Sequence, residues 1–331
     1  MGGDMLLEER MLQRIKLRDL RVLLSVIQLG SMGKAARALA ISQPAVSMAI
    51  SDMEQTLGVR LLDRTAQGVE ATPFGNIVMK WSFAIFDDLR QAAREIDLVG
   101  DPTAGEVRIG STEPMTAGLV AAVIDRLTRR YPRLNVQVTQ APTLRAQYQD
   151  LRERNVDLIL GRMVPAEVDS DLQSEILFDD PLFIVAGRRN KWTRRRKIHP
   201  SELLEEPWAL PSYADAFAGS RVAEAFRTCG LAPPRRTVSS SSIQLFVALM
   251  ATGRFLSLLS GSTMRFSGKR LGITTVPVEL PIRSGPVGIL TLQNRTLSAT
   301  AQRFAACARD VARPLRAVTR GRSKAGPASA D

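Results

Sequence analysis

The chain has 331 residues and a mass of 36.3 kDa, about twice the size of a common single domain, so two domains are expected. A hydrophobic content of 45% excludes a largely disordered protein. No apolar run approaches the roughly 18 residues that a membrane helix needs. The opening MGGDMLLEER carries acids where a signal peptide needs a basic and then an apolar segment. We therefore expect a cytoplasmic protein with no membrane contact.

The composition also argues against most classes of enzyme. The one histidine, His199, lies in a predicted loop, which leaves no imidazole for nucleophile activation or for a multi-histidine metal site. The GxSxG, Walker A and GxGxxG motifs are missing. Cys229 and Cys307 lie far apart in the sequence, and both are expected to be buried small hydrophobes. The sequence therefore predicts no catalytic residue, no metal and no cofactor.

The formal net charge of +12 indicates a polyanionic partner, but the charge is unevenly distributed. Residues 1–100 are balanced, and residues 101–331 hold 33 basic against 21 acidic side chains. Between Arg10 and Arg64, however, nine basic residues face four acidic ones. A local basic surface near the N-terminus is therefore expected.

Three helices are predicted near the N-terminus. Apolar residues at helical spacing, followed by a glycine, indicate a helix over residues 17–29. Ser31 is a suitable N-cap for a short alanine-rich second helix. After a brief gap, Ser42 and Pro44 open a third helix that ends before Gly58.

Two such helices joined by a tight turn are the arrangement that places a recognition helix in the major groove of DNA. Ser42, Gln43, Ser47 and Met48 are expected to point outward from the third helix. Glutamine can pair bidentately with adenine, and serine hydroxyls can contact bases or phosphates. An ordinary three-helix bundle explains the same spacing, so spacing alone leaves both possibilities open.

A resemblance to the DNA-binding end of LysR-type transcriptional regulators is carried by LRDLRVLLSVIQLGSMGKAARALAISQPAVSMAISDMEQTLGVRLLDRT. The signatures AA, SQPAVS and LGVRLLDRT stand at 35–36, 42–47 and 57–65. The resemblance implies a helix-turn-helix from Ser31 to Ile50. The family usually has Arg or Lys where this chain has Met48, so one phosphate or base contact is expected to be lost or replaced.

Arg60, Arg64 and residues 65–72 resemble the family's wing, a hairpin whose basic residues lie along the phosphate backbone. An ion pair with the adjacent Asp63 is the alternative role for Arg64. The expected partner is double-stranded DNA with a pseudo-palindromic operator. The expected DNA contacts are Ser31, Lys34, Ser42, Gln43, Pro44, Ser47, Met48, Arg60, Arg64 and Thr65.

A long helix is predicted over residues 73–99, with apolar residues at the 4, 3, 4, 3 spacing of a coiled-coil seam. One helix cannot bury such a seam, so a partner helix from a second subunit is expected. The resemblance adds that these regulators dimerise through this helix, usually form tetramers and act on RNA polymerase. The seam consists of Ile85, Leu89, Ala92, Ile96 and Val99.

The C-terminal two thirds alternate strand and helix, which argues for a parallel α/β sheet with ligands at the carboxyl ends of its strands. This part resembles the LysR effector domain, two α/β lobes similar to periplasmic binding proteins with a small-molecule cleft between them. The first lobe is expected at 105–182 and 285–318, and the second at 183–284.

The expected fold class is α/β, with a winged helix-turn-helix and linker helix preceding this two-lobed effector domain. The expected divisions are the DNA-binding domain 1–72, the linker helix 73–100, a hinge 101–105, the effector domain 106–320 and a disordered tail 321–331.

Polar residues at predicted strand-to-helix edges are candidates for contact with an effector. Free backbone N–H groups and the helix dipole favour an anion at such places, and Arg162 could hold a carboxylate bidentately. For each serine a helix-cap or turn role explains the residue equally well. The candidates are Ser111, Thr112, Thr143, Arg162, Ser212 and Ser240.

The run RRNKWTRRRK has seven basic residues in ten, and we interpret it as a solvated loop rather than a nucleic-acid site. The leading hypothesis is a one-component transcription factor, which is not an enzyme and whose small-molecule effector changes the placement of its DNA-binding dimers. The rival is a metabolic enzyme or solute-binding protein with an added helical dimerisation domain.

Overall fold

The computed structural model describes residues 6–65, 68–100, 104–141, 143–163, 169–211, 217–240, 242–282, 285–293 and 295–322. The chain forms two compact units that divide between Ala93 and Arg94. None of the described helices combines the length and the apolarity that spanning a bilayer requires.

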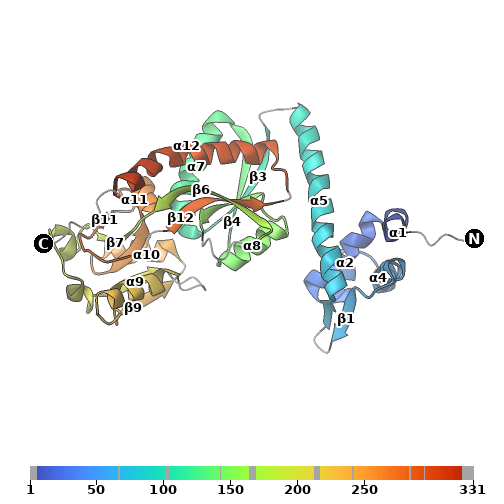
Figure 1. Ribbon diagram of the computed structural model, residues 1–331, viewed down its shortest axis with the longest axis horizontal. Coiled ribbons are helices and arrows are strands. Elements are labelled where there is room, and N and C mark those ends of the chain that lie inside the picture. Colours follow the sequence, from blue (N-terminus) through green and yellow to red (C-terminus); the bar gives the residue numbers. More distant parts are fainter. Residues whose placement is uncertain are drawn as a thin grey trace, which may run out of the picture. The chain divides into compact units, whose positions relative to one another are not determined.

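The first unit is mainly helical and ends in a small hairpin and a long helix (Figure 1). The three predicted N-terminal helices are present, and their core includes the fully buried Leu23, Val26, Ala35 and Val46. A further helix, α1, was not predicted. The elements are α1 (Leu7–Arg14), α2 (Leu17–Leu29), α3 (Met32–Ala38), α4 (Gln43–Leu57), β1 (Leu62–Thr65), β2 (Gly68–Ala71) and α5 (Pro73–Gly100).

The second unit contains two five-stranded sheets, and the first sheet has the order β4-β3-β5-β12-β6. Its elements are β3 (Ala104–Ser111), α6 (Glu113–Met115), the π-helical turn η1 (Thr116–Val120), α7 (Ala121–Arg130), β4 (Arg133–Gln140), α8 (Leu144–Arg152), β5 (Leu158–Arg162), β6 (Leu172–Asp180), β12 (Gly285–Leu292) and α12 (Ala299–Arg322). Strand β3 begins inside the range predicted for the hinge, and α12 runs to Arg322.

The first sheet is mixed, which corrects the prediction of a parallel one. Strand β3 pairs parallel with β4 and β5, but β12 is antiparallel to both β5 and β6. Strand β12 follows the second lobe in the chain and enters the first sheet between β5 and β6. The direction of a strand that returns from another lobe cannot be predicted from the residue pattern within the strand. Helices α7 and α12 lie side by side on one face (Figure 1), and α8 packs on the other.

The second sheet has the order β11-β7-β10-β8-β9, with α9 on one face and α10 and α11 on the other. Its elements are β7 (Leu182–Gly187), the 3-10 turns η3 (Lys191–Arg194) and η4 (Pro200–Leu203), β8 (Trp208–Pro211), α9 (Phe217–Thr228), β9 (Thr237–Ser240), α10 (Ile243–Ala251), β10 (Leu256–Ser260), α11 (Gly261–Ser267) and β11 (Ile273–Thr275).

The two cysteines differ in their surroundings. Cys307 is buried in the core of the first lobe, as predicted, and burial raises the pKa of its thiol. The prediction for Cys229 is wrong, because this residue is exposed just after the end of α9. A residue directly after a helix need not share the buried face of that helix.

Candidate nucleic-acid interface and effector site

Serine N-caps set the starts of the two helices of the helix-turn-helix. The Ser31 hydroxyl accepts a hydrogen bond from the Lys34 N–H at 3.4 Å, and the Ser42 hydroxyl accepts one from the Ala45 N–H at 3.3 Å. The turn between α3 and α4 holds Ala40 at a φ of 53°. These local interactions explain why the sequence pattern located both helices.

Helix α4 buries one side and exposes the N-terminal end of the other. Val46, Ile50 and Met53 lie in the core. Gln43 is exposed, and the Met48 side chain is 64% exposed. The remaining predicted residues on or beside this surface are Ser42, Pro44 and Lys34, all exposed, and Ser31, which is half-buried.

Ser47 is more enclosed than its predicted outward position suggests. It is half-buried, and its hydroxyl donates to the Met32 sulfur at 3.3 Å. Met32 lies 15 residues earlier in the chain, so this contact could not be predicted from the spacing of serines on α4.

The wing is the hairpin of β1 and β2, and backbone and side-chain hydrogen bonds fix it to the helices. The Val69 N–H donates to the Gly30 carbonyl at 3.0 Å. The Glu54 carboxylate accepts from the Leu61 N–H at 2.7 Å, and the Thr72 hydroxyl donates to the Arg60 carbonyl at 2.7 Å. The positioning roles of Glu54 and Thr72 were missed by the sequence analysis.

Among the predicted wing residues, Arg60 and Thr65 are exposed. The Thr65 hydroxyl donates to the Gly68 carbonyl at 3.4 Å, within the hairpin. The backbone of Arg64 belongs to β1, and its side chain lies outside the described residues, which leaves the choice between DNA and Asp63 open.

Replacing Gly68 by alanine is expected to displace the wing. The φ of Gly68 is +138°, and a Cβ atom there would lie 2.5 Å from the Gly30 carbonyl oxygen. We expect a loss of about 1–3 kcal/mol in stability and faster hydrogen exchange at the Val69 amide. Gly58→Ala is the control, because Gly58 also has a positive φ of +73° but open space around it. Unchanged exchange at Val69 would contradict the expected displacement.

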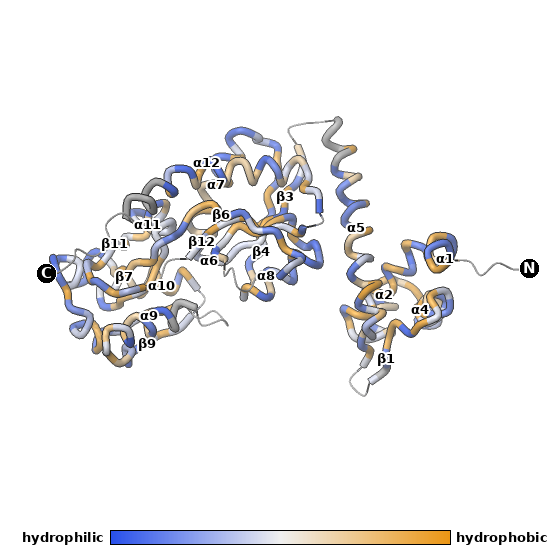
Figure 2. The backbone as a smooth tube through the Cα atoms, viewed as in Figure 1, coloured by the Kyte–Doolittle hydropathy of each residue, from blue (hydrophilic) through white to orange (hydrophobic). Residues whose placement is uncertain are grey.

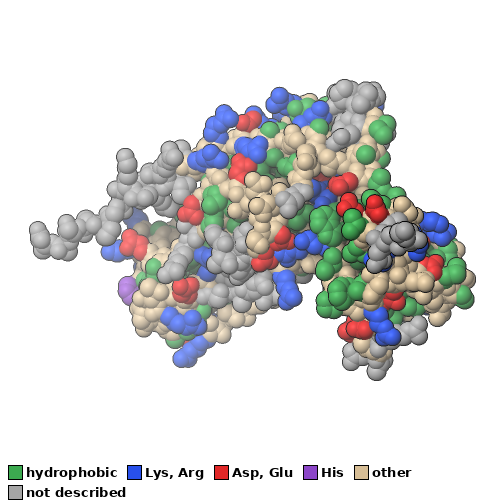
Figure 3. Space-filling view, turned by 45° about the vertical axis from the view of Figure 1, so that its right-hand side comes forward, with side chains coloured by type: hydrophobic (Ala, Val, Ile, Leu, Met, Phe, Trp, Pro, Cys, Tyr) green, Lys and Arg blue, Asp and Glu red, His purple; other side chains and the backbone are tan. Residues whose placement is uncertain are grey.

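Helix α5 exposes a continuous apolar stripe. Hydrophobic and hydrophilic residues alternate along its length (Figure 2), and hydrophobic side chains lie at the surface of the first unit (Figure 3). The predicted Ala92 is exposed as well. The large side chains of the stripe are Phe74 (52% exposed), Ile77 (57%), Trp81 (62%), Ile85 (38%), Leu89 (48%) and Ile96 (72%).

The stripe begins earlier than the predicted seam, because Phe74, Ile77 and Trp81 extend it toward the start of the helix. They continue the same spacing of three and four residues, so the sequence pattern could have predicted that they belong to the stripe. The side chain of Val99 lies outside the described residues.

The effector candidates of the first lobe divide into engaged and more open hydroxyls. Ser111 is fully buried, and its hydroxyl donates to the Leu160 carbonyl at 2.7 Å. Thr143 caps α8 by accepting from the Ala146 N–H at 2.9 Å. Thr112 is half-buried at the start of α6 and makes no side-chain cap hydrogen bond.

In the second lobe, the Ser240 hydroxyl accepts from the Ser242 N–H at 3.1 Å, and Ser212 lies outside the described residues. Near Thr112, the Glu113 carboxylate accepts from the Ile243 N–H at 3.0 Å. This hydrogen bond joins the start of α6 in the first lobe to the start of α10 in the second. The strands and helices therefore place Thr112 at the lobe boundary.

Arg162 lies where the chain crosses between the lobes, and its guanidinium contacts protein groups from both sides of that crossing. Its guanidinium donates to the carbonyls of Asp180 at 3.2 Å and Gly285 at 2.9 Å, and lies 3.5 Å from the Asp180 carboxylate. The same carboxylate accepts from the Ser262 hydroxyl at 2.6 Å. Burial lowers the pKa of Arg162, and the charges of Asp180 and Asp179 act against that shift.

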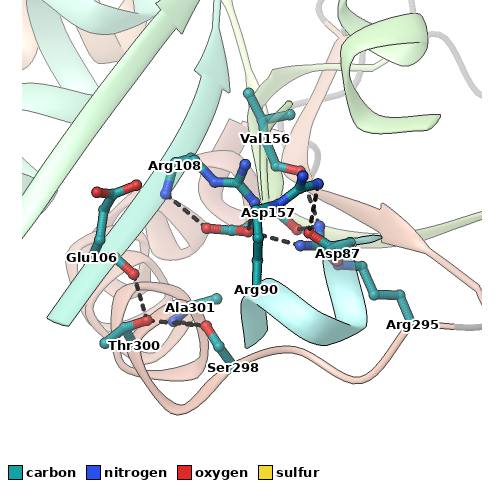
Figure 4. Close-up of polar contacts among 10 residues, drawn as sticks. All are labelled: Asp87, Arg90, Glu106, Arg108, Val156, Asp157, Arg295, Ser298, Thr300 and Ala301. Atoms are coloured by element: carbon teal, nitrogen blue, oxygen red, sulfur yellow. Dashed lines mark hydrogen bonds and ion pairs between the residues drawn. The ribbon is translucent and has the colours of Figure 1, made fainter. Parts of the chain in front are cut away.

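A second buried charge cluster holds the first sheet together at the start of β5 (Figure 4). The Asp157 carboxylate accepts from Arg108 at 2.8 Å and from Arg295 at 2.8 Å. Arg295 also donates to the Val156 carbonyl at 2.9 Å. In the same view, the Thr300 hydroxyl donates to the Glu106 carbonyl at 2.7 Å. These contacts join β3, the start of β5, the segment before α12 and the first turn of α12.

Comparison with known proteins finds a family match in each of the two parts of the chain. Residues 17–76 match the family described as bacterial regulatory helix-turn-helix protein, lysR family, and residues 100–313 match the LysR substrate binding domain. The chain is 28% identical over 287 residues to the HTH-type transcriptional regulator GbpR of Azospirillum brasilense, covering 86% of this chain and 83% of that protein.

Two further similarities extend over most of the chain. The transcriptional dual regulator GltC of Bacillus subtilis is 25% identical over 291 residues, which cover 88% of this chain and 95% of GltC. A full-length OxyR variant from Pseudomonas aeruginosa shares the fold with a TM-score of 0.59 at 22% identity, covering 90% of this chain and 94% of that one. The chain belongs to the LysR family of DNA-binding transcriptional regulators, with an N-terminal helix-turn-helix and a C-terminal effector-binding domain.

Proposed function

We propose that the N-terminal end of α4 reads an operator sequence, and that the protein acts in the cytoplasm, where its DNA lies, as a regulator and not as an enzyme. The exposed Gln43 at the first position of a serine-capped helix is the observation that carries this proposal. A glutamine there can reach the edge of an adenine, and the helix N-terminus favours a phosphate. Footprinting of the purified protein on DNA from its own genomic neighbourhood tests the proposal.

The surrounding residues complete the proposed DNA contacts. Ser42, Pro44, Ser47 and Met48 accompany Gln43 on α4, and Met48 offers an apolar contact, such as one to a thymine methyl group. Ser31 caps α3, Lys34 lies on it, and Arg60, Arg64 and Thr65 belong to the wing, where basic side chains fix position on the phosphate backbone.

Gln43→Ala is expected to weaken operator binding by about 1–3 kcal/mol while binding to random duplex changes little, because a base contact is lost and no charge is removed. Gln55→Ala is the matched control, since Gln55 is also an exposed glutamine of α4 but lies near its C-terminal end. Fluorescence anisotropy with both duplexes checks the prediction. An equal loss on both duplexes would assign Gln43 to the phosphate backbone.

We propose further that the apolar stripe of α5 pairs with the same helix of a second subunit. Ile85, Leu89, Ala92 and Ile96 form its C-terminal half, and six large exposed side chains on one helix face are far more than a solvated helix needs. A two-fold dimer presents two copies of α4 to a pseudo-palindromic operator, and two dimers make the tetramer that we propose as the working form.

The effector is proposed to bind at the lobe boundary, with Thr112 as the principal candidate. Ser240 lies close in sequence to the start of α10, which Glu113 joins to α6. Arg162 supports this boundary through its hydrogen bonds at the crossing between the lobes. Ser111 and Thr143 make their hydrogen bonds within the first lobe, and they and Ser212 remain proposed contacts. Thermal-shift screening of the full chain against metabolites tests the site, with Thr112→Val as the variant expected to lose the shift.

Effector binding changes transcription only through a difference in affinity for two arrangements of the protein. We propose that the lobes move about the crossing at Asp180 and Gly285, and that the movement alters the DNA-binding dimers and their contact with RNA polymerase. If the protein instead converts the small molecule that it binds, the enzyme hypothesis replaces this one, and product analysis after incubation with the bound compound distinguishes the two.

A further inference from the structure

Residues 188–197, here called the basic loop, join β7 to η4 and contain seven basic residues, all of them exposed. Five are arginines and two are lysines. The loop includes the short turn η3. It is the densest run of charge in the chain and has no part in the helix-turn-helix or at the lobe boundary.

Buried anchors give the basic loop a defined backbone. Asn190 is 1% exposed, accepts from the Trp192 N–H at 3.0 Å and donates to the Phe255 carbonyl at 3.5 Å. The Thr193 hydroxyl donates to the Asn190 carbonyl at 2.8 Å. Trp192 and Ile198 belong to the core of the second lobe. These hydrogen bonds and core contacts therefore fix the backbone from which the cations extend.

Two of the seven cations have roles within the protein. The Lys191 ammonium lies 2.6 Å from the Glu206 carboxylate and 5.0 Å from the centre of the Trp192 ring. Arg195 lies over the same ring at 5.8 Å. Among the described residues, no carboxylate forms an ion pair with the other five, which are Arg188, Arg189, Arg194, Arg196 and Lys197.

Two neighbouring segments add exposed cations to the same end of the second lobe. The Arg188 N–H donates to the Gly272 carbonyl at 3.2 Å, which brings the turn containing Lys269 and Arg270 to the loop. A Cβ atom on Gly253 would lie 3.2 Å from the Cβ atom of Arg189, so the exposed Arg254 is adjacent as well. Four acids lie near the loop: Glu206 pairs with Lys191, Glu202 accepts from the His199 N–H, and Glu205 and Glu279 are exposed. The cations at this end of the lobe therefore outnumber the acids.

In place of the solvated loop expected from the sequence alone, we propose that the basic loop and these neighbours bind the phosphate backbone of duplex DNA without regard to sequence. Like charges that are not matched within the protein repel one another, and a polyanion relieves this repulsion. The planar arginine guanidinium fits a phosphate bidentately, and arginine dominates the loop. The helix-turn-helix already brings DNA to the protein, so the loop acts as an additional contact beyond the operator-reading helix.

An acidic protein is the less suitable partner for this surface. Protein interfaces combine a polar rim with an apolar centre that is depleted in charge. The large apolar side chains in the loop and directly after it, Trp192 and Ile198, are 6% and 3% exposed and are packed in the core. The exposed part of the loop is almost purely cationic, which matches the dominant contribution of phosphate contacts to DNA affinity.

The test is the salt dependence of binding to a long random duplex by the full-length protein. The variant Arg189→Gln, Arg194→Gln, Arg196→Gln, Lys197→Gln removes four charges and keeps Lys191 and Arg195 on Trp192. Each lost phosphate contact lowers the slope of log affinity against log salt by about 0.9, so we expect a slope lower by about 2–4 and an affinity about tenfold or more lower near 0.1 M salt. Preference for the operator over random DNA should stay unchanged.

The control variant removes four exposed arginines from the first lobe, namely Arg129, Arg130, Arg145 and Arg313. It matches the change in net charge, so an equal loss of affinity in both variants would reduce the effect to net charge and overturn the proposal. If the loop variant has an unchanged salt slope and an unchanged melting temperature, the proposal is also overturned. The loop would then contact an acidic protein or only solvent.

A photo-crosslinker gives a direct second readout. It is attached at Ser201→Cys, an exposed position just after the loop, in a Cys229→Ser background that removes the exposed native thiol. We expect a protein–DNA adduct from this position and none from Gln137→Cys, which is exposed on β4 in the first lobe. Adducts from both positions, or from neither, would contradict a contact specific to the basic loop.

Discussion

Replacing Asp157 by asparagine is expected to lower the free energy of unfolding of the effector unit by about 3–5 kcal/mol. The Asp157 side chain is 3% exposed, and it accepts the Arg108 backbone N–H at 2.8 Å in addition to the two guanidinium groups. Arg295 is also 3% exposed. An amide cannot balance two buried cations, and its NH2 group places a donor where the carboxylate only accepted. Chemical denaturation followed by circular dichroism measures the loss.

Asp125→Asn is the matched control for this substitution. Asp125 also pairs with an arginine, Arg129 at 3.1 Å, but its side chain is 62% exposed and the pair lies on the solvent side of α7. Exposed pairs at this spacing contribute about 0.3–0.5 kcal/mol. If the two variants lose similar amounts of stability, the buried cluster does not stabilise the sheet as its geometry indicates.

The cluster also predicts a pH dependence. Burial acts to raise the pKa of Asp157, but the hydrogen bonds and charge of Arg108, with the charge of Arg295, hold this pKa below its ordinary value. A carboxyl with a lowered pKa in the folded state stabilises the fold above its unfolded pKa of about 3.9. This contribution is lost as the pH falls through the lower folded value. The difference in stability between wild type and Asp157→Asn is therefore expected to be constant near neutral pH and to shrink below about pH 4.

The DNA-binding unit could be predicted well because its signals are local. The Ser31 and Ser42 hydroxyls each cap a helix by accepting a hydrogen bond from the N–H three residues later. The apolar residues of α4 repeat every three or four residues. Glu54 and Thr72 were missed because each acts on a segment seven or more residues away. Helix α1 was missed; it has only eight residues, and none of their side chains is buried.

The effector unit was harder to predict because its polar side chains are paired over long distances in the chain. Arg162 reaches the Gly285 carbonyl 123 residues later, and Asp157 meets Arg295 138 residues later. The position of a strand-to-helix edge could be predicted from the sequence. The hydrogen-bond partner of each polar side chain at that edge could not. Ser111 and Thr143 show the consequence, since both hydroxyls make structural hydrogen bonds.

The double substitution Ile85→Asp, Leu89→Asp is expected to convert the protein to monomers and to lower operator affinity by about 10²- to 10⁴-fold. The two side chains lie one helical turn apart, 38% and 48% exposed, within the stripe that we propose as the dimer face. In the dimer, carboxylates at these positions would be buried against the same carboxylates of the second subunit. Their desolvation and repulsion would make the free energy of dimer formation less favourable. A monomer also loses the gain that comes from binding two half-sites together.

Asn76→Asp on the same helix is the control, because residue 76 is exposed and lies about 200° around the helix from Phe74, which belongs to the stripe. Light scattering gives the mass, and circular dichroism checks that the monomer stays folded, as expected from side chains that are exposed in the single chain. A double variant that remains dimeric at the wild-type concentration would place the subunit interface on another face. A monomer that keeps full operator affinity would show that α4 binds its site without a partner.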